Sequence, residues 1–262
     1  MKRTVQSSDG VRIVYQVGGD AEPTLVFIHG GLADRSFWDT QMEAFRNDHR
    51  VIALDLAGHG ESGADRPHWS IAAFAADVRS AAEAENAERI VLIGNSLGGP
   101  VAVEASLMLP GRTLGVVGVD TFHDLSRKVS PEEMRARIEA AQSDYPAFVQ
   151  QMISGLFHPD ADRALLNDLR RRMLRTPEAV AVDMLGSFAG YDLAGSVRKM
   201  TAPLRCINGD LYPVEWDLNR RIAPDFEGAI LPHTGHYPML EDPAAFNLNL
   251  KKIVDGFADP PR

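Results

Sequence analysis

The sequence has one cysteine, no long apolar run and fewer basic than acidic residues. Because Cys206 is the only cysteine in 262 residues, the chain cannot form an internal disulfide, which fits a reducing compartment. Its apolar surroundings, LRCIN, favour a packed core thiol over a nucleophile. The first ten residues lack the apolar stretch of a secretory signal, and no later run could cross a bilayer. With 36 acidic and 27 basic residues, the formal net charge is −9. These features predict a cytoplasmic protein without a nucleic-acid or membrane partner.

Short apolar runs rich in β-branched residues alternate with helical patterns along most of the chain. Residues 4–6 and 11–17 predict an opening hairpin. Six later runs are apolar on both faces, as strands covered by helices should be, at residues 24–29, 50–55, 89–94, 114–120, 203–208 and 228–232. This repetition predicts an α/β fold: a mainly parallel central sheet of about eight strands, flanked by helices.

The alternation stops between residues 122 and 200. The segment SPEEMRARIEAA begins with a capping box from Ser130 to Glu133 and has Pro131 at the first helical position. Two further segments show helical spacing, and no strand-like run interrupts them. We therefore expect residues 122–200 to form a helical cap inserted after the sixth strand, with residues 1–121 and 201–262 forming the core.

The segment GNSLG, residues 94–98, places a serine between two glycines where a strand gives way to a helix. On so sharp a turn, side chains two positions before and after Ser96 would collide, and glycine relieves the clash. The amide of Leu97 then lies at a helix N-terminus, which suits a developing oxyanion. The alternative is a serine that only caps the helix.

A reactive serine needs a base and a second oxyanion donor. FIHGG ends an earlier strand and places Gly31 where a loop could aim its amide into the same space. His236, in the loop after the last strand, is the candidate base, and His233 is the nearby alternative. We expect His29 to be a structural hydrogen-bonding group. Four further histidines are expected on the surface or in turns: His59, His68, His123 and His158.

Four motifs occur together and in order: HGG (29–31), DLAGHGES (55–62), GNSLGG (94–99) and GHYPMLEDP (235–243). In these motifs the chain resembles the cap-bearing members of the α/β-hydrolase superfamily. The resemblance implies a Ser–acid–His triad, an oxyanion hole from the Gly31 and Leu97 amides, and a substrate pocket formed by the cap. Asn95 is a departure, because many members have histidine before the serine; we expect no effect on the chemistry.

The candidate base also needs a carboxylate to fix its tautomer. Members of the superfamily usually supply it three residues beyond a glycine after the penultimate strand, and here Gly209 leads to Tyr212 at that position. A minority place the acid directly after the strand that precedes the cap, which in this sequence ends at Asp120. We therefore expect Asp120 to be the acid. Asp210 is the alternative if the loop shifts by two residues.

Together these residues predict a carboxylesterase-like hydrolase that cleaves a small-molecule substrate through an acyl-enzyme, with Ser96, His236 and Asp120 as the triad and no cofactor or metal. GHGESG, residues 58–63, matches a dinucleotide-binding pattern, but no helix begins there. A serine rather than an aspartate at the turn argues against dehalogenase and epoxide-hydrolase chemistry. Three alternatives stay open: a slow-turnover receptor for a small molecule, a carbon–carbon bond hydrolase and a cofactor-free perhydrolase. The sequence indicates neither the natural substrate nor the oligomeric state.

Overall fold

A computed structural model describes residues 1–258 of the chain. In these residues eight strands form one sheet, in the order β1-β2-β4-β3-β5-β6-β7-β8. β2 is antiparallel to both of its neighbours, and all the other pairs are parallel. The predicted α/β fold with a mainly parallel sheet is confirmed. The strands are β1 (Lys2–Gln6), β2 (Arg12–Gly18), β3 (Thr24–Ile28), β4 (Val51–Leu54), β5 (Ile90–Asn95), β6 (Thr113–Val119), β7 (Leu204–Gly209) and β8 (Glu227–Leu231).

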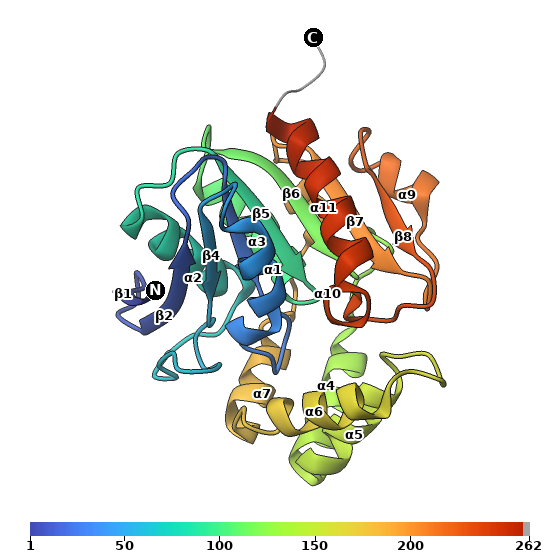
Figure 1. Cartoon of the computed structure of the whole chain (residues 1–262). Coiled ribbons are helices and arrows are strands. Elements are labelled where there is room, and N and C mark those ends of the chain that lie inside the picture. The colour runs from blue at the N-terminus through green and yellow to red at the C-terminus, as the bar shows by residue number, and fades with distance from the viewer. Residues whose placement is uncertain (259–262) are drawn as a thin grey trace.

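Helices cover both faces of the sheet (Figure 1). α1 (Asp39–Phe45) and α11 (Pro243–Ala258) lie on one face, and α2 (Ile71–Ala84) and α3 (Gly98–Met108) pack together on the other. None of the helices in residues 1–258 combines the length and apolarity that a bilayer span requires. The shorter helical segments are η1 (Arg35–Trp38), α8 (Leu193–Val197), α9 (Trp216–Arg220) and α10 (Pro238–Glu241).

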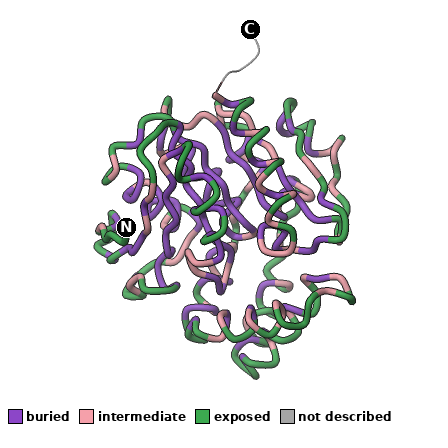
Figure 2. The backbone as a smooth tube through the Cα atoms, in the orientation of Figure 1, coloured by how far each residue is buried: buried purple, intermediate pink, exposed green. Residues whose placement is uncertain are grey.

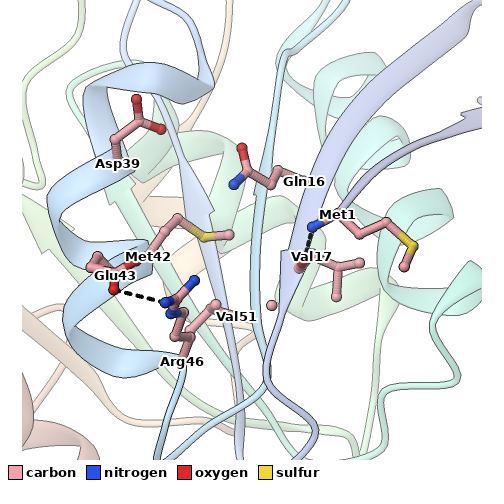
Figure 3. A pocket seen from close by; sticks show the side chains of 9 residues that line it. Met1, Gln16, Val17, Asp39, Met42, Glu43, Arg46 and Val51 are labelled. Carbon is pink, nitrogen blue, oxygen red and sulfur yellow. Dashed lines mark hydrogen bonds and ion pairs between the residues drawn. The ribbon is translucent and has the colours of Figure 1, made fainter.

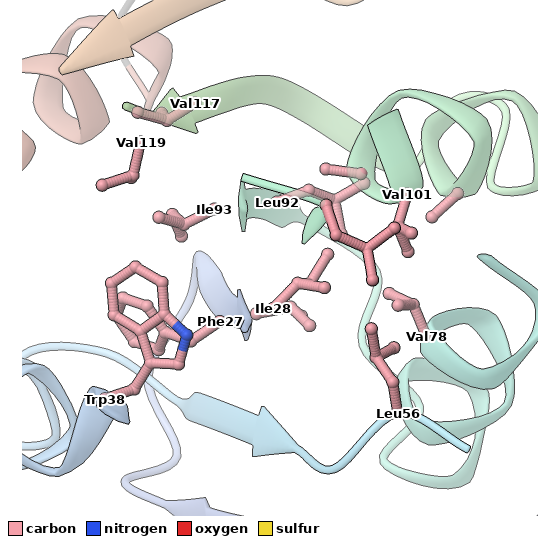
Figure 4. Close-up of a cluster of buried hydrophobic side chains, with 14 of the residues drawn as sticks. Phe27, Ile28, Trp38, Leu56, Val78, Leu92, Ile93, Val101, Val117 and Val119 are labelled. Atoms are coloured by element: carbon pink, nitrogen blue, oxygen red, sulfur yellow. The ribbon is translucent and has the colours of Figure 1, made fainter. Parts of the chain in front are cut away.

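The core fills the space between the sheet and these two helical layers (Figure 4). Successive residues of β3 point to opposite faces. On one side, the ring centroids of Phe27 and Trp38 lie 5.2 Å apart. On the other side, Ile28 faces Val78 and Val101 of the helices. All five residues of β3 are buried because both faces of the sheet are covered. Burying one such side chain stabilises the fold by roughly 1.5–3 kcal/mol.

Four further helices lie between β6 and β7 in the chain and gather beyond one end of the sheet (Figure 1). Much of their surface is exposed, in contrast to the central strands (Figure 2). α8, which follows them, packs against α3 on the sheet side. The division into core and cap at residues 121 and 200 stays a prediction. The four helices are α4 (Pro131–Ser143), α5 (Tyr145–Ser154), α6 (Arg163–Met173) and α7 (Glu178–Gly186).

β3 and β5 are neighbours at the centre of the sheet, but the chain leaves them in opposite directions. β3 connects to β4 on one side, and β5 connects to β6 on the other. Such a reversal leaves a crevice at the carboxyl ends of the two strands, where open α/β sheets bind their ligands. Residues 29–31 and 96–97 follow β3 and β5 directly and therefore lie at this crevice.

A buried ion pair holds the loop between β4 and α2 against the helix. Arg66 donates to the Asp77 carboxylate at 2.5 Å and to Asp9 at 2.8 Å. The side chains of Arg66 and Asp77 are both fully buried. The second oxygen of Asp77 accepts the Ala57 N–H at 3.1 Å, so the pair also fixes the backbone just beyond β4.

Replacing Arg66 by methionine should leave Asp77 buried without its partner. We expect the free energy of unfolding to fall by about 3–5 kcal/mol, measured by urea denaturation at pH 7. The matched control is Arg79→Met on α2, whose side chain is 33% exposed and 3.8 Å from Glu83. This control should change stability by no more than about 0.5 kcal/mol. Equal effects of the two substitutions would contradict the role given to the buried pair.

Candidate active site

Ser96 occupies a strained turn between β5 and α3. Its φ of 52° lies in the left-handed region, which costs a non-glycine residue about 1–3 kcal/mol. The Ser96 N–H donates to the Val119 carbonyl at 3.1 Å, which ties the turn to β6. A Cβ atom on Gly94 would lie 2.0 Å from the Gly98 carbonyl oxygen, and one on Gly98 would lie 2.4 Å from that of Ile28. Close backbone contacts therefore require glycine at both positions.

The carboxylate of Asp120 directly contacts the imidazole of His236. Asp120 follows β6, and its Oδ2 lies 2.6 Å from Nδ1 of His236. Its Oδ1 accepts the Gly209 N–H at 3.1 Å, and His123 Nε2 lies 3.5 Å away. Burial alone would raise the pKa of Asp120, but hydrogen bonds and charge interactions with His123 and His236 lower it to about 2. The ionised carboxylate favours the tautomer of His236 with its proton on Nδ1, which leaves Nε2 free to accept a proton.

Two side chains fix the backbone on either side of His236. Asn95 Nδ2 donates to the His236 carbonyl at 3.0 Å, and it also donates to the Val119 carbonyl of β6. The Glu241 carboxylate accepts the N–H groups of Gly235 at 2.9 Å and Tyr237 at 3.0 Å. The sequence indicates neither contact, because it predicts only that Asn95 has no effect on the chemistry and it assigns no role to Glu241. The available signal was the place of Glu241 inside the GHYPMLEDP motif.

Gly31 and Leu97 follow adjacent strands, and neither backbone N–H has a hydrogen-bond acceptor within residues 1–258. The residue after Gly31 has a φ of 60°, and its N–H donates to Nε2 of His59 at 3.3 Å. His59 lies in a turn, as expected, but it is fully buried. Burial lowers its pKa to about 3, so it stays neutral and supports the loop that carries Gly31.

Ser96, His236, Gly31 and Leu97 all line one cavity of about 640 Å³. These four residues lie in loops that follow the strands, whereas α4, α5 and α7 contribute most of the opposite wall. A smaller cavity of about 270 Å³ adjoins it at Ser96 and Leu97. The apolar side chains of the larger cavity include Phe148, Met152, Met184, Leu185 and Phe188.

Another hollow, of about 350 Å³, lies between α1 and the amino-terminal hairpin (Figure 3). Glu43 and Arg46 form an ion pair of 2.9 Å beside it, and the amino group of Met1 donates to the Val17 carbonyl at 2.6 Å. The described residues that line it include no serine, cysteine or histidine. It therefore offers neither a hydroxyl or thiol nucleophile nor an imidazole base.

The alternative acid and base lie near each other, and no hydrogen bond joins Asp210 to His236 among the described residues. Asp210 Oδ1 is 2.8 Å from Nε2 of His158, and its Oδ2 accepts the His233 N–H at 3.1 Å. The structure thus brings His236 together with Asp120 and not with Asp210. Tyr212, which stands at the usual acid position, donates its hydroxyl proton to the Gly155 carbonyl at 2.7 Å.

His29 and Cys206 are both buried. Nε2 of His29 accepts the Leu56 N–H at 3.0 Å, and Nδ1 lies 2.7 Å from the Gly30 carbonyl oxygen. Burial lowers the pKa of His29 to about 4, which keeps it neutral, as a structural hydrogen-bonding group should be. Burial raises the pKa of the Cys206 thiol to about 12, so it carries no thiolate near neutrality.

A family model described as "Alpha/beta hydrolase family" matches residues 25–247. The chain belongs to this family. The prediction that the chain is an α/β-hydrolase enzyme is therefore confirmed.

The chain is 26% identical over 267 residues to the dihydrolipoyllysine-residue acetyltransferase component of the acetoin cleaving system of Cupriavidus necator, covering 95% of this chain and 68% of the other. It is 24% identical over 254 residues to a pimeloyl-[acyl-carrier protein] methyl ester esterase of Nitrosospira multiformis, covering 88% and 94%. A thermophilic esterase from Thermogutta terrifontis has the same fold, with a TM-score of 0.87 at 24% identity, covering 99% and 100%.

The low pKa of Asp120 predicts a specific dependence of stability on pH. A carboxyl group with a folded pKa of about 2 contributes stability above its ordinary pKa of 3.8, and this contribution is lost as the pH falls through 2. The difference in free energy of unfolding between the wild type and Asp120→Asn should therefore shrink by about 1 kcal/mol between pH 5 and pH 3. Urea denaturation at the two pH values measures this difference. Asp217→Asn, at a side chain that is 95% exposed, is the control. A difference that stays constant or grows would contradict the prediction.

Proposed function

We propose that this enzyme hydrolyses an ester-like bond of a small molecule, with Ser96 as nucleophile, His236 as base and Asp120 as the acid that orients His236. The observation that carries the proposal is the contact of 2.6 Å between Asp120 and His236, in the wall of a cavity that Ser96 also lines. The relative from Nitrosospira multiformis is named as a methyl ester esterase, which agrees with this chemistry.

Each proposed step follows from the groups around the cavity. Nε2 of His236 takes the proton of the Ser96 hydroxyl as Oγ attacks the substrate carbonyl, and Asp120 stabilises the imidazolium that forms. The amides of Gly31 and Leu97 donate to the oxyanion. When the intermediate collapses, His236 gives its proton to the leaving oxygen and the alcohol departs. A water molecule, deprotonated by His236, then releases the acid by the same route.

We further propose that residues 122–200 act as a cap that shields this reaction from bulk water. The apolar residues of α5 and α7 that line the cavity would bury the uncharged part of a substrate. The cap segment also contacts the proposed base, because the His236 N–H donates to the Leu156 carbonyl at 2.8 Å. A shift of this segment would therefore alter the position of His236.

Replacing Ser96 by alanine should abolish hydrolysis of p-nitrophenyl butyrate, because no other described group in the cavity would carry the acyl chain. We expect kcat to fall by at least about 10³-fold, measured by nitrophenolate release, with the far-UV circular dichroism unchanged. Full activity in this variant would overturn the proposal. A wild-type burst of one equivalent without steady turnover would instead favour a slow-turnover receptor.

The two candidate acids should differ sharply when each is replaced by asparagine. Asp120→Asn should lower kcat by about 10⁴-fold, because His236 loses the carboxylate that fixes its tautomer. Asp210→Asn alters only the contacts with His158 and with the His233 N–H, neither of which involves His236, and should change kcat by less than about threefold. The steady-state rate with the same ester measures both. A mild effect at Asp120 together with a large one at Asp210 would reverse the assignment.

A further inference from the structure

The two cavities beside Ser96 differ in the groups that line them. Ser96 and Leu97 line both, so the proposed nucleophile stands at their junction. Of the two, only the larger is lined by His236 and Gly31. A substrate held at Ser96 would extend into both cavities. The larger is mostly apolar, whereas the smaller contains several charged and polar side chains.

The place of His236 decides which part of an ester enters which cavity. The leaving oxygen must lie within hydrogen-bond reach of the imidazole that protonates it. His236 lines the larger cavity, so the alcohol portion belongs there. The oxyanion points to the Gly31 and Leu97 amides, and the remaining substituent of the carbonyl carbon is the acyl chain. That chain is directed into the smaller cavity, which we call the acyl chamber.

Two guanidinium groups line the acyl chamber and share one carboxylate. Arg127 and Arg137 donate to the same oxygen of Glu133, at 3.0 and 2.6 Å. Arg137 lines both cavities, whereas Glu133 lines the larger one only. Two positive charges against one negative charge leave one guanidinium charge uncompensated within this group. Guanidinium groups bind carboxylates with two parallel hydrogen bonds, so the cluster can accept a second carboxylate.

The other polar groups of the acyl chamber do not cancel this positive charge by direct pairing. Asp124 is the one carboxylate in the lining of the chamber. Oδ1 of Asp124 already accepts hydrogen bonds from the Ser126 N–H at 2.8 Å and from the Ser126 hydroxyl at 2.6 Å. His123 and Tyr191 also line the chamber. His123 can donate a hydrogen bond to an anion, whereas the Tyr191 hydroxyl already donates to the Pro100 carbonyl at 3.5 Å. In a chain with a net charge of −9, a donor-rich chamber beside the nucleophile indicates selection of an anionic group.

We propose that the acyl chamber binds a terminal carboxylate, so that the preferred substrates are hemi-esters of short dicarboxylic acids with an apolar alcohol. This rests on the proposed function. The Ser96 Oγ–acyl bond forms as the bond to the alcohol oxygen breaks, and that oxygen takes its proton from His236. Water then releases the free dicarboxylic acid. Throughout, Arg127 and Arg137 hold the distal carboxylate and set the length of the acyl chain.

Matched esters with and without the distal charge test this selection. Monobenzyl esters of succinic, glutaric, adipic and pimelic acid are compared with benzyl alkanoates in which a methyl group replaces the carboxylate. Release of benzyl alcohol, followed by chromatography, gives kcat/KM for each. The wild type should prefer the charged ester by about tenfold or more at one chain length. Equal kcat/KM values at every length would overturn the inference.

Variants of the charge cluster should move the ratio of charged to neutral kcat/KM in opposite directions. The double variant Arg127→Met and Arg137→Met should abolish the preference, whereas Glu133→Gln should increase it by freeing both guanidinium groups. The control is Arg135→Met, also on α4, because its side chain is 65% exposed and lines neither cavity. The ratio within one variant cancels any loss of folded protein.

The outcomes separate the two proposals. If the preference for the charged ester survives in the double variant, or is lost equally in Arg135→Met, the assignment of the acyl chamber is wrong. The proposed ester hydrolysis is unaffected by either result. If the wild type cleaves neither the charged nor the neutral esters in a manner that requires Ser96, the proposed function itself fails.

Discussion

The contact between Asp120 and His236 joins residues 116 positions apart in the chain, and the site depends on it. Asp120 follows β6, and His236 lies in the loop after β8, so the two meet only when β6, β7 and β8 pair in register. Gly209, at the end of the intervening strand β7, donates its N–H to the second carboxylate oxygen. The same strand pairing that builds the sheet therefore also orients the Asp120 carboxylate, the proposed acid, and any shift in register would separate it from the imidazole.

With Asp120 as the proposed acid, the loop after β7 is free for another task. In this chain that loop holds the segment between α5 and α6: the Tyr212 hydroxyl bonds the Gly155 carbonyl, and Asp210 contacts His158. Between these two contacts, the Leu156 carbonyl accepts the N–H of His236. One short segment of the proposed cap is thus fixed both to the β7 loop and to the proposed base. Cap position and imidazole position are coupled through these bonds.

Local patterns predicted the parts of the molecule that depend on neighbouring residues. Ser96 and its glycines could be predicted because a strand-to-helix turn has steric requirements within five residues. The expectation for Asp120 came instead from the resemblance to α/β-hydrolases that place the acid after the strand preceding the cap. Asn95 and Glu241 could not be predicted, since their roles come from contacts with the His236 loop, a partner that the sequence does not place. The packing of α4–α7 was also beyond prediction. The amphipathic pattern shows that each helix has an apolar side, but not which neighbour covers it.

Histidine serves different purposes in this molecule because its surroundings differ. Burial lowers the pKa of His29 to about 4 and of His59 to about 3, so both stay neutral and act as hydrogen-bonding supports beneath the Gly31 loop. His236 instead contacts the Asp120 carboxylate at 2.6 Å and lines a cavity together with Ser96. A fully buried ring suits a fixed hydrogen-bonding role, whereas a ring that has a carboxylate partner and lines a cavity suits the role of base that we propose for His236. The environment around each ring, rather than the residue type, therefore separates these roles.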